Sequence, residues 1–183
     1  MTLLDALAVL VVAAYAALGM LTGTVRRVIG LIGAYLALLI ATNMGQQGGG
    51  VFQQYSPTTS VTDARLYGWL FFFFLLLLVF EGMAAAVGSR LQVAVLAFDR
   101  LIGTIVGLLT GGVVAVAVTY MLVGYSEAAG GQPTQLQSNL RPMVANSTVA
   151  IPFARSSDPL LRTFFYAALP RDAHAYFAFE GPH

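Results

Sequence analysis

The chain alternates between long apolar runs and shorter polar stretches. The apolar runs cover residues 3–21, 28–44, 66–87 and 101–123. A helix that crosses a bilayer needs about 20 consecutive apolar residues, and these runs reach or nearly reach that length. The pattern therefore predicts an all-α membrane protein with about four transmembrane helices. It leaves open whether the shortest run, 28–44, spans fully or is tilted or partly re-entrant.

The polar stretches predict how the helices connect. The stretch TGTVRR after the first run is tight, so we expect the first two helices to form an antiparallel hairpin. The second connection, GQQGGGVFQQYSPTTSVTD, is expected to be a long polar loop, and the third, GSRLQVAVLAFDR, is too short for a domain. We therefore expect two hairpins in a four-helix transmembrane domain at 1–124, followed by a tail at 125–183.

Composition supports a membrane location and argues against several classes of function. Charged residues make up 9% of the chain and hydrophobic residues 58%, against about 25% charged residues in soluble proteins, so the lipid bilayer is the expected surrounding. The net charge of +1 argues against nucleic acid as a partner. Cysteine and lysine are absent, and His174 and His183 both lie near the C-terminal end. We therefore expect no enzyme activity, no cofactor and no metal site.

The arginines predict an orientation in the membrane. Arg26, Arg27, Arg90 and Arg100 lie in the first and third connections, whereas Arg65 alone flanks a run on the other side. Short loops rich in arginine face the cytoplasm. We therefore expect Arg26, Arg27 and Arg100 to act as cytoplasmic anchors. Both termini and the tail are then extracytoplasmic.

Three glycines on the fourth run predict a close helix crossing. Gly103, Gly107 and Gly111 fall four residues apart, the spacing of a glycine zipper. The second run offers a matching small-residue face at Gly30, Gly33, Ala34, Ala37 and Ala41. We expect the fourth helix to pack on the second, either as ordinary tight packing or as a sliding or dimer interface. Asp99, just ahead of the glycines, is expected to cap the fourth helix while Arg100 anchors at the headgroups.

Glu81 is an acidic residue inside an apolar run. It lies about 10 Å from the cytoplasmic end of its helix, and the sequence indicates no second acid or base at similar depth. An intramembrane acid marks an ion or proton path or an interhelical bond. Three roles stay open: a structural hydrogen bond, ion or proton handling, and contact with a partner subunit.

The tail changes character along its length. Residues 126–148 are polar and predict a loop, whereas Asp158 and Pro159 are typical of a helix start and Pro170 of a helix end. We therefore expect an amphipathic helix near 159–169. Its apolar face would comprise Leu160, Leu161, Phe164 and Phe165. This face would contact either the membrane or the protein's own outer surface.

Two motifs resemble the colicin V production protein (CvpA) family of small bacterial inner-membrane proteins. The matching positions are Asp5, Gly19, Gly23, Val25 and Arg26 in the first motif and Asp99, Arg100, Gly103, Gly107 and Gly111 in the second. A weaker match is the segment SNLRP at 138–142. The chain departs from the family pattern at Arg27, where a glutamate is common, and at Thr110, where an arginine is frequent. A salt bridge between those two positions therefore cannot be assumed.

The resemblance implies a function without implying a reaction. Family members are linked to export of a peptide toxin and to envelope stress tolerance, and they have no established catalytic activity. We expect a scaffold or accessory subunit whose partner is another membrane or extracytoplasmic protein or a second copy. The alternatives are a small proton- or ion-coupled transporter that uses Glu81, and an anchor that recruits an extracytoplasmic protease or cell-wall enzyme.

Overall fold

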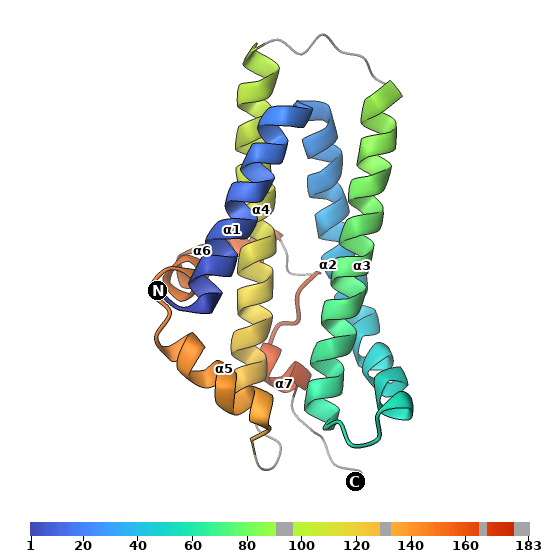
Figure 1. Ribbon diagram of the computed structural model, residues 1–183, viewed down its shortest axis with the longest axis vertical. Helices are drawn as coiled ribbons and strands as arrows, with labels where there is room; N and C mark the ends of the chain where they lie inside the picture. Colours follow the sequence, from blue (N-terminus) through green and yellow to red (C-terminus); the bar gives the residue numbers. More distant parts are fainter. Residues whose placement is uncertain (91–96, 129–132, 165–167, 178–183) are drawn as a thin grey trace.

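Every regular element in the described part of the chain is a helix. The computed structural model describes residues 1–90, 97–128, 133–164 and 168–177 (Figure 1). The four long helices are α1 (Leu3–Thr22), α2 (Thr24–Tyr55), α3 (Val61–Arg90) and α4 (Ala97–Glu127). Three short helices follow, α5 (Gln135–Ala145), α6 (Ala150–Phe164) and α7 (Ala173–Phe177). All four long helices are apolar and long enough to cross a membrane, so the prediction of an all-α membrane protein is confirmed.

The second helix is much longer than its apolar run. It continues through the glycine-rich stretch that was predicted as a loop, and residues 56–60 alone connect it to α3. Gly45, Gly48 and Gly49 lie against α3, close to Trp69, Phe72 and Arg65 respectively. Glycine is a poor helix former in water, but here its lack of a side chain lets the two helices approach closely. The predicted long loop is therefore wrong because interhelical packing outweighs local propensity.

The four long helices form two side-by-side pairs (Figure 1). α1 packs on α4, α2 packs on α3, and α2 and α4 join the two pairs in the centre. The tight turn between α1 and α2 is present, with Gly23 as its single connecting residue. However, α1 has its main interface with the last long helix and not with its neighbour in sequence. The prediction of two hairpins of consecutive helices is therefore only half right, because the α1–α2 turn is present but α1 packs mainly on α4.

The tail folds back onto α4. α5, α6 and α7 all pack against that helix, and Phe153 of α6 lies against Gly112 near its middle. The loop predicted at 126–148 is wrong, because α5 occupies much of it. The tail helix was placed too late, since α6 begins at Ala150 and its first-turn proline is Pro152.

The predicted apolar face of the tail helix falls at the edge of the described residues. The backbones of Leu160, Leu161 and Phe164 belong to α6. Their side chains, and Phe165 as a whole, lie outside the described residues.

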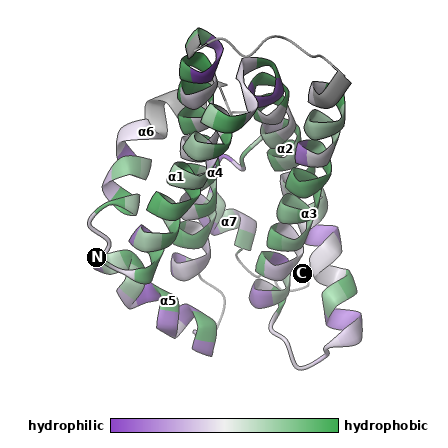
Figure 2. Ribbon diagram, turned by 45° about the horizontal axis from the view of Figure 1, so that its top comes forward, coloured by the Kyte–Doolittle hydropathy of each residue, from purple (hydrophilic) through white to green (hydrophobic). Residues whose placement is uncertain are grey.

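Hydrophobic residues dominate the four long helices, and polar residues gather on α5 and at helix ends (Figure 2). The protein core lies between α2, α3 and α4 and includes Leu38, Trp69, Phe73 and Met121. The outer faces of the long helices expose apolar side chains such as Leu10, Phe71 and Leu78. Exposed apolar surface of this extent is what a lipid-facing protein presents.

Candidate functional site

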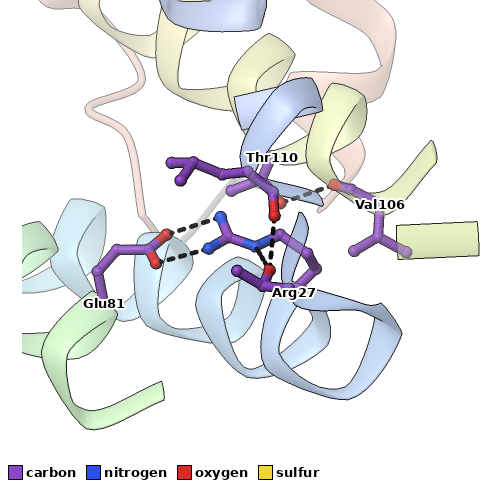
Figure 3. A network of polar contacts seen from close by, with 6 residues as sticks. Arg27, Glu81, Val106 and Thr110 are labelled. Atoms are coloured by element: carbon purple, nitrogen blue, oxygen red, sulfur yellow. Dashed lines mark hydrogen bonds and ion pairs between the residues drawn. The ribbon is translucent and has the colours of Figure 1, made fainter. Parts of the chain in front are cut away.

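A buried ion pair joins α2 to α3. Arg27 donates from Nη1 to Glu81 Oε1 at 3.3 Å and from Nη2 to Glu81 Oε2 at 3.2 Å. Figure 3 shows the guanidinium and the carboxylate facing each other as two parallel forks. The side chain of Arg27 is 1% exposed and that of Glu81 is 21% exposed. Bidentate pairs of this kind are among the stronger hydrogen-bonded contacts in proteins.

Further contacts surround the pair. Arg27 Nε donates to Thr22 Oγ1 at 3.0 Å, and the guanidinium carbon lies 5.8 Å from the centre of the Tyr15 ring. Gly30 leaves room for the carboxylate, because an added Cβ would lie 3.1 Å from Glu81 Oε1. Thr110 lies in the same region, fully buried, and donates to its own helix at Val106 (Figure 3). The site is therefore a packed polar cluster that includes side chains from α1, α2 and α3.

The ion pair corrects two expectations. The side chain of Arg27 is buried against Glu81 and does not project outward as a headgroup anchor would, and Glu81 does have a basic partner. The predicted depths of Arg27 and Glu81 were each measured from the nearest end of an apolar run. In the structure α2 begins at Thr24, so Arg27 is in its first turn, whereas α3 continues beyond Glu81 to Arg90. Arg26 points elsewhere, with its side chain packed along Gly88 of α3.

Asp99 caps α2 and not its own helix. Its Oδ1 accepts from the backbone N of Thr24 at 3.0 Å, and Thr24 Oγ1 donates to the Asp99 carbonyl at 3.0 Å. Gly23 precedes this start with φ of +77°, a conformation that L side chains rarely adopt, and a Cβ there would collide with the Asp99 carboxylate. Asp99 thus holds the α1–α2 turn against α4, while Arg100 is exposed.

The glycines of α4 pack on α1 and not on α2. A Cβ on Gly103 would lie 2.5 Å from the carbonyl oxygen of Gly19, and a Cβ on Gly107 would collide with the carbonyl of Tyr15. At Gly111 the nearest atom would be Cα of Val12 at 2.8 Å. The expected small-residue crossing is therefore present with a different partner.

The small-residue face of α2 serves other contacts. Gly30 meets Glu81 of α3, while Ala34 and Ala37 are fully buried in the core.

Asp5 is a buried carboxylate on α1, and it caps the start of α6 in the tail. It is 0% exposed and accepts from Ser147 Oγ at 2.6 Å, from Val149 N at 3.1 Å and from Ala150 N at 3.0 Å. The first amide groups of α6 are thus satisfied by a carboxylate on α1, which also suits the positive end of a helix dipole. From the sequence, Asp5 was predicted only as a motif position, and no partner was assigned to it. The Ser147-Thr148 pair ahead of Pro152 is the signal that indicates a helix start here.

Residues 4–152 match the model of the family described as colicin V production protein. The chain belongs to this family. The matched range includes Asp5, Arg27, Glu81, Asp99 and the α4 glycines, but it ends before α7. No curated protein and no solved structure matches the chain.

In this colicin V production family member a further polar cluster ties α3, α4 and α5 together. Tyr125 and Thr134 both donate to Asp63 Oδ1, the second at 2.9 Å. Gln137 Nε2 donates to the Tyr125 carbonyl at 2.9 Å, and Arg141 Nε donates to the Ser126 carbonyl at 2.9 Å. These bonds satisfy the last carbonyls of α4. This cluster was not predicted from the sequence, because its members come from three segments far apart in the chain.

The described residues do not suggest a metal centre. Within them, no group of three or more histidine, cysteine, aspartate or glutamate side chains is placed to hold a metal ion. Arg27 and Glu81 converge inside the bundle and contact each other directly. Chemically, such a pair can hold two helices in register, or it can exchange a proton if it opens.

Proposed function

We propose that this protein is a non-enzymatic accessory or scaffold subunit of the bacterial inner membrane that supports peptide toxin export or envelope maintenance. Membership of the colicin V production family supports a role in peptide toxin export or envelope maintenance. The arginine distribution supports a cytoplasmic location for the α1–α2 turn and for the start of α4. The tail helices are then extracytoplasmic.

The observation that carries the scaffold role is how four buried or partly buried carboxylates are used. Glu81 joins α2 to α3 through Arg27, Asp99 joins α4 to the start of α2, and Asp5 joins α1 to α6. Asp63 joins α3 to α4 and the start of α5. Each carboxylate fixes one helix to another. A bundle held in this way presents a defined surface to a partner.

A second candidate function rests on the same cluster. Glu81 is partly exposed, and both it and Arg27 interact electrostatically with Tyr15. A proton-coupled transporter requires an intramembrane acid of this kind that can lose and regain its proton. In that case the carboxylate itself is essential, whereas a scaffold needs only the helix contact.

The double variant Arg27→Met with Glu81→Leu separates the two functions. Replacing a buried ion pair by apolar residues of similar size is often neutral or stabilising. We expect cells that carry the double variant in place of the wild type to export toxin at wild-type levels per molecule in the membrane. The measurement is toxin in the medium, normalised to the abundance of the variant. A double variant that is abundant and folded but supports no export contradicts the scaffold role and favours coupling through Glu81.

The orientation has a separate test, since the natural chain has no cysteine. Thr58→Cys places a thiol in the α2–α3 connection, and Phe98→Cys places one at the exposed start of α4. A membrane-impermeant maleimide should label Thr58→Cys in intact spheroplasts and Phe98→Cys only after permeabilisation. The reverse labelling pattern contradicts the proposed topology.

A further inference from the structure

Arg26 lies in the first turn of α2, beside the end of α3. The α1–α2 turn, the end of α3 and the start of α4 share one end of the bundle (Figure 1), which is the cytoplasmic end in the proposed topology. The stem of Arg26 runs along Gly88, where an added Cβ would lie 3.4 Å from Cβ and 3.5 Å from Cδ of the arginine. The side chain is therefore half-buried against α3 and is not surrounded by solvent.

The guanidinium group of Arg26 contains a buried donor without an acceptor. In the described part of the chain, Nε of Arg26 is the one buried side-chain nitrogen or oxygen that has no hydrogen-bond partner. Arg27 differs, because its Nε donates to Thr22 and both of its Nη atoms donate to Glu81. Buried polar groups in proteins nearly always have a partner. The exception at Arg26 therefore points to an acceptor that the chain itself does not supply.

The electrostatics around Arg26 favour an anion as that acceptor. An arginine side chain stays protonated in proteins, and within the described residues Arg26 forms no ion pair. The two acids that contact the first turn of α2, Glu81 and Asp99, are bonded to Arg27 and to the Thr24 amide. The turn itself contains no acidic residue, and the positive end of a helix dipole also attracts negative charge.

The position and the surroundings of Arg26 indicate which anion it binds. Arg26 and Gly88 lie at the ends of the α2 and α3 spans that can cross a membrane, which is the level of the lipid phosphates. Val25, Val87 and Met83, which lie next to them in sequence or one turn away, are exposed apolar side chains. A hydrated phosphate ion gains nothing from such a surface. A phospholipid matches both features, with its phosphate at the helix ends and its acyl chains against their apolar sides.

We propose that Arg26, seated on Gly88, is a binding site for the phosphate group of an anionic phospholipid between α2 and α3. The planar guanidinium suits a phosphate because it can donate two parallel hydrogen bonds, here with Nε as one of the donors. Val25 and Val87 would contact the acyl chains. The proposal does not rest on the accessory role. Its test measures lipid binding and not export, so its failure leaves the accessory role standing.

The test is a titration of the full detergent-solubilised chain with phosphatidylglycerol, and separately with phosphatidylcholine, read by native mass spectrometry. Arg26→Lys keeps the positive charge but has no guanidinium fork. Loss of one charge-assisted hydrogen bond corresponds to about tenfold in affinity. We therefore expect Arg26→Lys to bind its first phosphatidylglycerol about tenfold more weakly than the wild type. Phosphatidylcholine should bind both proteins equally weakly.

The matched control is Arg100→Lys, which makes the same chemical change at an exposed arginine of α4. This variant should bind phosphatidylglycerol as tightly as the wild type does. Equal affinity of Arg26→Lys and the wild type overturns the proposal. An equal loss in both lysine variants also overturns it, because that result reflects the general attraction of a basic surface for anionic lipid.

Two measurements on the wild type need no variant, and they decide the matter if Arg26→Lys does not fold. The Tm should be higher in phosphatidylglycerol nanodiscs than in phosphatidylcholine nanodiscs, because a ligand of the folded state stabilises it. Equal Tm values overturn the proposal. Inorganic phosphate should not displace bound phosphatidylglycerol. Displacement, or tight binding of inorganic phosphate to the lipid-free protein, would identify a soluble anion as the ligand and overturn the assignment to a lipid.

Discussion

The α1/α4 and α2/α3 pairs both depend on glycine, but the glycines do different work. In α1/α4 the glycines bring two backbones together, as at Gly103 against Gly19 and Gly107 against Tyr15. In α2/α3, Gly48 accommodates the ring of Phe72, and Gly30 accommodates the carboxylate of Glu81. The α1/α4 pair is closed mainly by main-chain contact, whereas the α2/α3 pair combines main-chain contact, as at Gly68 against Gly45, with side chains that lie against Gly30 and Gly48.

This difference predicts how each interface responds to substitution. A backbone cannot move aside without distorting its helix, so an added side chain in α1/α4 has no simple compensation. A phenylalanine ring can be exchanged for a smaller group, and an ion pair can be exchanged for an apolar pair of similar size. Substitutions at Gly30 and Gly48 of α2/α3 should therefore be repairable by a second substitution, whereas those at Gly103 and Gly107 of α1/α4 should not.

Breaking the ion pair of α2/α3 should have the largest effect. Glu81→Leu leaves the buried Arg27 without its partner and should lower the free energy of unfolding by about 3–5 kcal/mol, whereas Arg27→Met leaves the partly exposed Glu81 and should cost less. The double variant should recover most of that loss. Unfolding by steric trapping in bicelles measures all three. Additive losses in the double variant would show that the pair does not act as a unit.

Gly107→Ala should have the next largest effect, because its methyl group would collide with the Tyr15 carbonyl. Overpacking at such a site costs about 1–3 kcal/mol. The matched control is Gly82→Ala on α3, where a Cβ would meet nothing within 4 Å, so this change should be neutral or slightly stabilising. The same unfolding assay applies to both variants, and equal stability of the two would contradict the backbone contact.

Gly48→Ala tests whether α2/α3 can be repaired. The new methyl group would lie 2.5 Å from the edge of the Phe72 ring, and we expect a loss of about 1–2 kcal/mol. Combination with Phe72→Leu should cost less than the sum of the two single changes, by a coupling of about 0.5–3 kcal/mol. The full set of four proteins forms a double-mutant cycle. Strict additivity would mean that the ring already moves aside freely.

Asp99→Ala should have the smallest effect of the four, because it removes one cap at the exposed end of the α1–α2 turn. We expect a fall in Tm smaller than that caused by Gly107→Ala, measured by thermal unfolding in detergent. Asp99→Asn keeps an acceptor for the Thr24 amide and should retain most of the stability. A larger loss for Asp99→Asn than for Asp99→Ala would contradict the capping role.

The sequence predicted the helical class and the family, because both rest on local patterns. Apolar runs of membrane-spanning length require no knowledge of neighbours, and the spacing of Gly103, Gly107 and Gly111 correctly indicated a close crossing. The partner of that crossing was not predictable in this way, since α1, α2 and α3 all carry small residues. Choosing among them depends on how all the helices pack at once.

The candidate site was harder to predict because its members are far apart in the chain. Arg27 and Glu81 are separated by 54 positions, and their contact depends on how far α3 extends past the start of α2. The start of α6 depends on Asp5, which no local capping rule can identify. Helix propensity likewise predicted a loop at Gly48–Gly50, where α3 supplies the stabilising contact. Local rules found the helices, and distant contacts fixed their ends.

The Asp5 cap has a consequence for how the protein is made. Apart from the Thr2 amide, the donors that satisfy this carboxylate are 142 to 145 residues further along the chain. At about 5–20 residues per second, a ribosome needs roughly 7–30 s to synthesise that length. During this interval Asp5 has only the nearby Thr2 amide, which donates to it at 2.8 Å, so water or another donor must satisfy the rest of the carboxylate. The N-terminal helix therefore reaches its final state only after the fourth helix and the start of the tail have emerged.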